Sequence, residues 1–349
     1  MFKRKRWMML AATFALLVLL LGIAVGCAPD EEPEPEPDPD EEAEPDEDPE
    51  PDMDLPDEVV FATGPTGGSW YPLGVASGEI WERELGVTTH TELGGGEANI
   101  RGVHAGQYDF GHSHSFAVIN AIDGIGPFEG DPQENIAGVA ALYPNVQQTV
   151  VLADSDIYSI DDLPGKRIGP GPQGFGGETL AQWILDYHDL SYDDMGTVEH
   201  VGYSDAVALM ADRHLDVFWP NTLMPAPSIE ELAVTGPGVR IVELEDHVIE
   251  ALEDRNPGLM RFTVPAGTYR GHEEDVDTIT TFTIIITRPD MSEEAVYQFT
   301  KALIENRERK YDVSAFLEEW FTPEQAPVGI GVELHPGARR YYEEIGVLD

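Results

Sequence analysis

Cysteine and basic residues are scarce in this sequence, and each shortage excludes a class of protein or of bond. Cys27 is the only cysteine among 349 residues, so no disulfide can form within the chain. Lysine and arginine together number 20 against 66 aspartates and glutamates, which gives a formal net charge of −46. A nucleic acid is excluded as a partner, because contact with phosphates requires a basic face.

Long apolar runs are missing as well, except near the first residue. Residues 7–25 form such a run, after the four bases Lys3 to Arg6 and before Gly26-Cys27. This order is typical of an export signal, so we expect residues 1–26 to be a signal peptide. The stretch 24–27 resembles a bacterial lipobox, which implies that Cys27 is lipidated; an uncleaved membrane anchor is the alternative. In both cases we expect the rest of the chain to lie outside the cytoplasm. It would be anchored in the lipid bilayer at the outer face of the cell membrane, or it would be periplasmic.

Residues 27–58 form an acidic, proline-rich segment that we expect to be a disordered linker. Between Ala28 and Glu58 there are eighteen carboxylates and no lysine or arginine. Such a composition cannot bury enough apolar surface to offset the entropy of ordering, and like charges extend it. Residues from Val59 onward still carry a net charge near −32. We therefore expect a halophilic protein, whose self-repulsion is screened by a salty environment.

The remaining residues alternate short β-branched runs with helical stretches, which predicts a mainly parallel α/β sheet. The expected strands are 58–63, 87–93, 109–111, 146–153, 166–169, 216–219 and 279–287. The expected helices are 71–85, 98–105, 116–122, 178–188, 203–213 and 293–306. The rhythm restarts near residue 146, so we expect two α/β lobes joined by a hinge.

Glycine-rich turns follow several of these strands and are the candidate ligand site. In open α/β sheets, ligands bind beyond the carboxyl ends of strands, where helix N-termini present free N–H groups. The turns are 63–71, 93–96 ahead of Asn99, 112–115, and 169–179 in the second block. The candidate binding residues are Thr63, Thr66, Gly67, Gly68, Ser69, Trp70, Tyr71, Gly95, Asn99, Ser113, Ser115, Gly174, Phe175, Gly176, Gly177, Trp219, Asn221 and Tyr269.

Other functions leave weaker signals. No turn ends in Gly-Lys-Ser/Thr, and Ser69 lacks the Gly-x-Ser-x-Gly setting of a hydrolase, so we expect neither an enzyme nor a nucleotide or other cofactor. His112 and His114 alternate along a strand, with His90 and His104 nearby, so a metal-binding receptor is an alternative. A ligand-sensing subunit of a signalling system is another.

Several stretches carry, in order, the motifs of a known family. They are FATG at 61–64, TGGSWYPLG at 66–74, Gly94-Gly95 with Asn99, AGQYDFG at 105–111, LPGKRI at 163–168, VPAGTY at 264–269 and VYQFTKAL at 296–303. With these the sequence resembles the TAXI family of solute receptors, which serve TRAP transporters.

The resemblance implies a type II periplasmic-binding-protein fold with an interlobe cleft. Lobe 1 would be 59–142 plus 265–349, and lobe 2 would be 143–264. It also implies a small organic anion such as glutamate or 2-oxoglutarate as ligand, and a membrane permease with fused small and large subunits as partner. The chain departs from the family at Gly96, Phe116 and Phe175, where hydroxyl or acidic residues are usual, which makes the pocket less polar.

A carboxylate could be held here without a buried lysine. Backbone N–H groups at the helix starts after Gly68 and Gly176 would meet its charge. We therefore expect Arg101, Lys166 and Arg167 to be surface charges rather than ligand contacts. Closure of the two lobes on the ligand is the expected transduction step.

Overall fold

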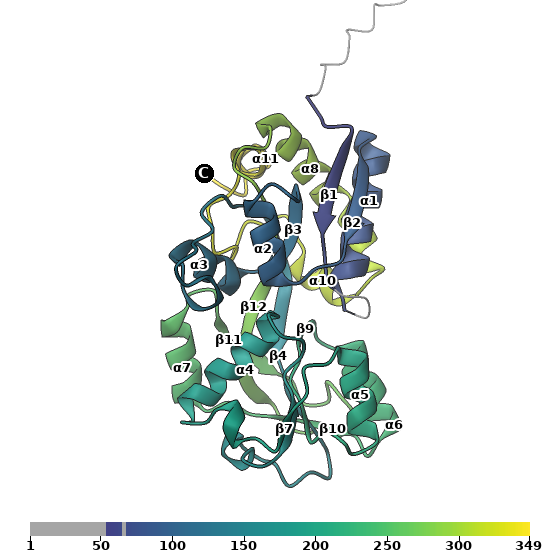
Figure 1. Ribbon diagram of the computed structural model, residues 1–349. Coiled ribbons are helices and arrows are strands. Elements are labelled where there is room, and N and C mark those ends of the chain that lie inside the picture. Colours follow the sequence, from purple (N-terminus) through teal and green to yellow (C-terminus); the bar gives the residue numbers. More distant parts are fainter. Residues whose placement is uncertain (1–53, 65–67) are drawn as a thin grey trace, which may run out of the picture. The chain divides into compact units, whose positions relative to one another are not determined.

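The computed structural model describes residues 54–64 and 68–349 (Figure 1). The predicted signal peptide, Cys27, nearly all of the acidic linker, and the candidate residues Thr66 and Gly67 lie outside the described residues. Within the described residues, none of the helices combines the length and the hydrophobicity needed to cross a bilayer.

The first part of the chain builds three strand–helix units. They are β1 (Glu58–Ala62) with α1 (Trp70–Leu85), β2 (Thr88–Glu92) with α2 (Gly96–His104), and β3 (Phe110–His114) with α3 (Ser115–Asp123). β1 lies between β2 and β3 and is parallel to both. Val59 and Phe61 are buried, and the Phe61 ring packs on Trp81 of α1 with 5.5 Å between the ring centroids.

Two long antiparallel strands complete this first sheet. β12 (Val276–Thr287) runs between β3 and β4 (Ala137–Gln147), and it pairs antiparallel with both. The short strands β9 (Asn221–Thr222) and β11 (Met260–Val264) extend it, and the order is β2-β1-β3-β12-β4-β9 with β11 on β12. The residues of β4 are buried along its whole length, and the helices α8, α10 and α11 contact it.

A second sheet is built from the middle of the chain. Its strands are β5 (Thr149–Leu152), β6 (Arg167–Gly169), β7 (Thr197–Val198), β8 (Val217–Phe218) and β10 (Val239–Val242). Their order is β10-β5-β8-β6-β7. The helices of this part are α4 (Gly176–Tyr187), α5 (Tyr203–Ala211), α6 (Pro227–Thr235) and α7 (Asp246–Arg255). The short 3-10 turns are Gly126–Phe128, Ile160–Asp162 and Tyr192–Asp194. The chain ends with α8 (Glu293–Glu305), α9 (Glu308–Tyr311), α10 (Phe316–Trp320) and α11 (Pro336–Glu344), of which α8 and α11 pack beside the first sheet (Figure 1).

The two sheets share one strand order. In the first sheet, β1 lies between its parallel neighbours β2 and β3, and β12 runs antiparallel beside β3. In the second sheet, β6 lies between its parallel neighbours β7 and β8, and β5 runs antiparallel beside β8. The architecture is mixed α/β with two sheets, one in each half of the described chain, which confirms the predicted fold class. The residue bounds of the two lobes stay a prediction.

The chain passes between the sheets over very short distances. β4 ends at Gln147 and β5 begins at Thr149, so Gln148 alone separates a strand of one sheet from a strand of the other. Gln148 is fully buried, and its backbone N–H donates to the carbonyl of Pro220, on the second crossing between β8 and β9. Crossings tied to each other in this way are suited to act as a hinge.

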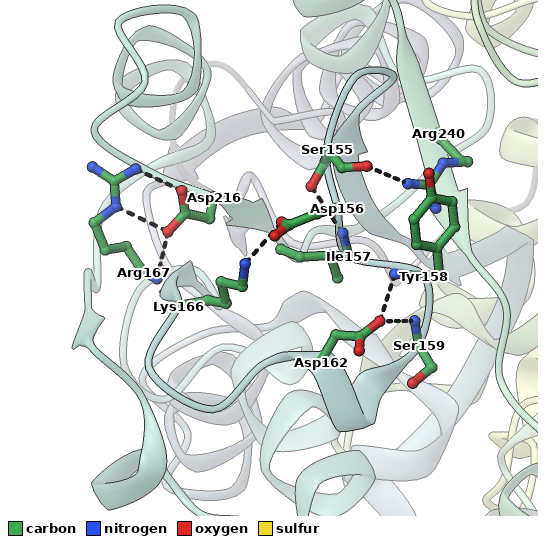
Figure 2. Close-up of polar contacts among 10 residues, drawn as sticks. All are labelled: Ser155, Asp156, Ile157, Tyr158, Ser159, Asp162, Lys166, Arg167, Asp216 and Arg240. Atoms are coloured by element: carbon green, nitrogen blue, oxygen red, sulfur yellow. Dashed lines mark hydrogen bonds and ion pairs between the residues drawn. The ribbon is translucent and has the colours of Figure 1, made fainter.

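Basic side chains of the second half are paired with acids at its surface (Figure 2). The Arg167 guanidinium donates to both carboxylate oxygens of Asp216, at 2.9 and 2.5 Å, and Lys166 donates to Asp156 at 2.8 Å. Arg240 lies over the exposed ring of Tyr158, 4.3 Å from its centroid. The expectation that Lys166 and Arg167 are surface charges is therefore confirmed.

One cation of the first half is buried instead. Lys310 on α9 is fully buried, and its Nζ donates to the carbonyl of Leu73 at 2.9 Å and to the Ser77 hydroxyl. Burial lowers the pKa of Lys310 to about 7, because the apolar surroundings disfavour the ammonium form.

Candidate ligand-binding site

A cavity of about 170 Å³ lies where strand–helix turns of the two sheets meet. This volume suits a small organic molecule. The residues that line it are Gly68, Ser69, Trp70, Gly95, Gly96, His114, Asn145, Pro172, Phe175, Gly176, Gly177, Gly202, Tyr203, Ser204, Asp205, Asn221 and Thr222.

Four helices begin at this cavity. Their first residues, Trp70 of α1, Gly96 of α2, Gly176 of α4 and Tyr203 of α5, all line it. The first N–H groups of a helix have no partner within the helix, and together with the helix dipole they attract negative charge. α1 and α2 follow strands of the first sheet, and α4 and α5 follow strands of the second. Both halves of the molecule therefore present anion-attracting helix ends to one space.

Aromatic side chains form much of the wall. Trp70, Phe175 and Tyr203 come from three different helix starts. Trp70 is held in place by a hydrogen bond from its Nε1 to the Thr283 hydroxyl at 2.9 Å, and its ring packs on His114 with centroids 4.6 Å apart. The Tyr203 hydroxyl donates to the carbonyl of Asn221 at 3.1 Å. These contacts fix the walls before any ligand arrives.

His114 contributes a neutral ring. Burial lowers the pKa of His114 to about 3, so the ring is uncharged at neutral pH. Its Nδ1 accepts a hydrogen bond from Asn145 Nδ2 at 3.1 Å. The ring proton must therefore be on Nε2, which makes His114 a hydrogen-bond donor at the cavity.

Two asparagines at the cavity have oxygens to spare. Asn145 is 1 % exposed and Asn221 is 6 % exposed, and neither side-chain oxygen has a hydrogen-bond partner among the described residues. Asn145 Nδ2 is occupied by His114 and by the Thr283 hydroxyl, and Asn221 Nδ2 donates to the carbonyl of Asn145. Both oxygens are closed off from the cavity in this form, so a ligand or an ordered water would reach them only after a small side-chain rotation.

The two halves approach closely around the cavity, and glycine makes this possible. A Cβ on Gly95 of the first half would lie 2.6 Å from the Phe175 ring of the second. A Cβ on Gly176 of the second half would lie 2.6 Å from the His114 ring of the first. Any side chain at either position would hold the halves apart.

Part of the predicted site lines this cavity. The candidates found there are Gly68, Ser69, Trp70, Gly95, Phe175, Gly176, Gly177 and Asn221. The Ser69 hydroxyl is 2.7 Å from the Tyr143 hydroxyl, and Gly177 lies against Asn221, where a Cβ would be 3.1 Å away. Their role in binding stays a prediction, now with a common location.

Other candidates are placed outside the cavity lining, and most have partners in the framework. Asn99 Nδ2 donates to the carbonyls of Thr63 and His112, which ties β1 to β3, and the Thr63 hydroxyl donates to the carbonyl of Glu92. The Ser115 hydroxyl contacts Gly258 and Thr281, and the Ser113 hydroxyl donates to Gly96.

The remaining four lie outside the lining for different reasons. Tyr269 donates to Gln148 at 2.7 Å and accepts from the N–H of Ala226, so its hydroxyl holds the hinge region instead. Trp219 is fully buried in the core. Tyr71 is half-buried and Gly174 is exposed, and neither reaches the cavity.

The sequence did not single out several of the residues that line the cavity. Asn145 lies inside a strand, where no turn signals it. His114 lies in the predicted ligand turn 112–115, but only Ser113 and Ser115 of that turn were predicted to bind the ligand. Gly202, Ser204 and Asp205 form the start of a predicted helix, so the rule applied to the other turns could have found them.

The histidines do not assemble a metal site. His90 pairs with Glu58 at 3.0 Å, and His104 accepts from the N–H of Asn135. His112 is buried against the Phe61 ring, and burial lowers its pKa well below the usual range. Across residues 54–64 and 68–349, no group of three or more histidine, cysteine or acidic side chains could hold a metal ion.

No lysine or arginine lines the cavity within the described part of the chain. Arg101, the nearest candidate in sequence, pairs with Asp131 at 2.6 Å and lies over the Phe128 ring. The expectation that Arg101 is a surface charge is thus confirmed.

A family model and a curated protein match parts of this sequence. A model of the NMT1-like family matches residues 61–346. Among curated proteins, the homeobox-leucine zipper protein REVOLUTA of Arabidopsis thaliana is 27% identical over 212 residues, which cover 55% of this chain and 23% of that protein. The chain therefore spans less than a quarter of the length of the curated relative that it matches.

Among solved structures, the similarity lies in the fold. A Bordetella bronchiseptica RB50 protein has a TM-score of 0.50 and 12% identity, covering 84% of this chain and 90% of its own. PhnD1 of Prochlorococcus marinus in complex with methylphosphonate has a TM-score of 0.49 and 12% identity, over 75% of this chain and 90% of its own. The periplasmic aliphatic sulphonate binding protein SsuA of Escherichia coli has a TM-score of 0.45 and 15% identity, over 82% and 79%.

Proposed function

The chain belongs to the NMT1-like family, and from this we propose that it is an extracytoplasmic solute receptor. It captures a small organic anion between its two lobes and delivers it to a membrane transporter. The observation that carries this proposal is the convergence of four helix N-termini, two from each half, on one cavity. A ligand that contacts both halves binds the closed form better than the open form, and only such a difference can drive closure.

Binding without chemistry fits the groups at the cavity. Ser69, the residue closest to a nucleophile in its sequence setting, shares a hydrogen bond with Tyr143 rather than with a histidine base. His114 is neutral and is fixed by Asn145. These contacts favour a receptor over an enzyme.

The transporter that we propose is a TRAP permease with fused small and large subunits, as the TAXI resemblance implies. Two proteins with similar folds bear names that refer to ABC transporters, one for phosphonate and one for L-cystine. The experiment must therefore determine which energy source drives uptake with this receptor. Membrane vesicles containing the permease should take up solute in the presence of the receptor when an ion gradient is imposed. Uptake that requires ATP and ignores the gradient would contradict this part of the proposal.

Attachment through a lipidated Cys27 is the remaining part of the proposal. Two signals, the positively charged start and the Cys27 setting, support it. A Cys27→Ser variant should be released from cells into the medium or periplasm, whereas the unchanged protein stays with the membrane fraction. Equal membrane retention of both forms would indicate an uncleaved anchor.

Solute binding itself can be tested with the purified full-length protein. Specific binding to the folded state raises the melting temperature by mass action. Isothermal titration with amino acids, 2-oxoacids, dicarboxylates, sulfonates and phosphonates should identify at least one ligand. A folded protein that binds none of these classes would refute the proposed function.

A further inference from the structure

We infer that the solute carries a positively charged nitrogen as well as its negative group, so that the cavity takes a small zwitterion rather than a dianion. This inference rests on the proposed function, and it narrows the class of solute. It comes from the distribution of charge and of unpaired acceptors around the cavity.

The helix ends at the cavity are not equally positive. A helix N-terminus carries roughly half a positive charge, and a carboxylate in the first turn offsets it. α4 and α5 each have such a carboxylate, from Glu178 and Asp205. α2 has Glu97, whose pKa burial raises to about 7, so that it offsets the helix end only in part at neutral pH. α1 has no acidic residue in its first turn. The end of α1, beside Ser69 and Gly68, is therefore where a single anionic group is best stabilised.

Asp205 gives the opposite side of the cavity a negative charge. Of the described residues that line the cavity, it is the only one with an ionised side chain, since His114 is neutral. The lining includes no lysine or arginine in the described ranges that would balance a second carboxylate of the solute. A dianion such as 2-oxoglutarate would place one of its charges near Asp205 without compensation.

The uncharged polar and aromatic groups at the cavity also favour a solute with a positively charged nitrogen. The side-chain oxygens of Asn145 and Asn221 are buried acceptors without a described partner, and a hydrogen-bond donor of the solute would satisfy them once a small side-chain rotation turns them to the cavity. An ammonium group supplies up to three donors, whereas a carboxylate supplies none. The rings of Trp70, Phe175 and Tyr203 add faces that attract cations.

A solute with a positively charged nitrogen near a carboxylate satisfies all of these groups. Two kinds of solute have this chemistry. An amino acid presents a primary ammonium, which would donate to the asparagine oxygens. A fully methylated ammonium presents no donor and would depend on the aromatic faces and Asp205. Alanine and leucine represent the first source, and glycine betaine represents the second.

The test compares matched solutes on the full-length protein by isothermal titration. Alanine and leucine are each paired with the 2-oxoacid of the same skeleton, which lacks the nitrogen, and glycine betaine stands alone. Glutamate and 2-oxoglutarate provide the same comparison with a second carboxylate. We expect at least one of the net-neutral zwitterions to bind about tenfold or more tightly than its nitrogen-free counterpart and than 2-oxoglutarate.

Asp205→Asn is the decisive variant, and Asp212→Asn is its matched control. Both residues are exposed on the same helix, but Asp205 lies at its cavity end and Asp212 at the other end. Asp205→Asn should weaken the zwitterion about tenfold and leave the 2-oxoacid unchanged or bound more tightly. Asp212→Asn should change neither.

Three outcomes would overturn the inference. Equal or tighter binding of the nitrogen-free acid would show that the nitrogen is not recognised, while leaving the receptor function intact. Equal losses for both solutes in Asp205→Asn would show a merely structural effect. Binding of no solute at all would instead refute the proposed function together with the inference.

Discussion

Thr179 on α4 donates a hydrogen bond to the carboxylate of Glu97 on α2, with 3.2 Å between Oγ1 and Oε1. The bond joins the two halves of the molecule beside the cavity. Burial raises the pKa of Glu97 to about 7; the bond from Thr179 opposes this shift, nearby Glu178 adds to it, and Arg101 opposes it weakly. In an opened form, where water reaches Glu97, its pKa should return toward the ordinary value of 4.5.

Glu97 should therefore make solute affinity depend on pH. A carboxyl whose pKa is raised in the closed form binds a proton more tightly there, so closure is favoured at low pH, and this advantage is lost as the pH rises from 4.5 to about 7. The Kd of the unchanged protein should rise several-fold over this range. The Glu97→Gln variant should show a flat profile, and Glu92→Gln, an exposed acid nearby, should keep the slope. Equal slopes in all three proteins would contradict the assignment.

Gly95 should be required for the halves to meet. Its backbone, at φ −157°, is extended and accepts any residue, so Gly95→Ala causes no backbone strain. Its Cβ would instead meet the Phe175 ring across the cavity. We expect solute binding to weaken about tenfold while the melting temperature of the free protein changes little. Adding Phe175→Ala should restore part of the loss, and a double variant no better than the sum of the single ones would argue against this contact.

Lys310 should make stability depend on pH in the alkaline range. Its pKa falls from 10.5 in the unfolded chain to about 7 in the folded protein, so between these values the unfolded chain binds a proton that the folded one does not. Stability should thus rise with pH, by about 1.4 kcal/mol for each pH unit.

The Lys310→Met variant isolates this effect. It removes the titrating group and leaves the Ser77 hydroxyl bonded to Leu73 at 2.8 Å. Urea unfolding at several pH values should show the variant as the more stable protein near pH 7, with the difference shrinking toward pH 10. A difference that does not vary with pH would mean that burial does not lower the pKa of Lys310 and that the side chain stays charged in the folded protein.

Salt should stabilise the protein strongly. The acidic excess of the folded part is near −32, and most of the basic groups are already engaged in surface pairs such as Arg167–Asp216 and Arg213–Asp154. Screening of the remaining repulsion should raise the melting temperature by at least about 5 °C between about 0.1 and 2 M NaCl, or roughly 2 kcal/mol. An uncharged osmolyte at the same osmolality is the control. An equal response to both would remove the electrostatic explanation.

The alternation of strands and helices was predictable because each unit carries a local signal. Helix α1 begins at Trp70, one residue before the prediction, and ends at Leu85 as predicted, before Gly86 in the left-handed conformation. β12 begins at Val276, three residues before the predicted start, and ends at Thr287 as predicted. Alternating β-branched runs suffice to find elements of this kind.

Strand β4 shows where local signals fail. Its sequence contains Gly138, Pro144 and several alanines, which have little strand propensity, and its pairing with β12 and its burial decide its conformation. The predicted strand 146–153 is in fact the end of β4 and the whole of β5, separated at Gln148. A change of sheet leaves no mark on a continuous apolar run. Asn145 was missed for this reason, although it lines the cavity.

The position of β12 also sets the order in which the protein can fold. The first sheet is completed only when β12 inserts between β3 and β4, and Ser115 and Thr281, which bond at 2.8 Å, are 166 residues apart. The strands of the second sheet all lie between Thr149 and Val242. Contacts of short sequence separation form faster, so the second sheet should acquire protection from hydrogen exchange first during refolding. If the chain emerges from a membrane pore with its N-terminus first, the first sheet cannot be completed until β12, in the last quarter of the chain, has also emerged.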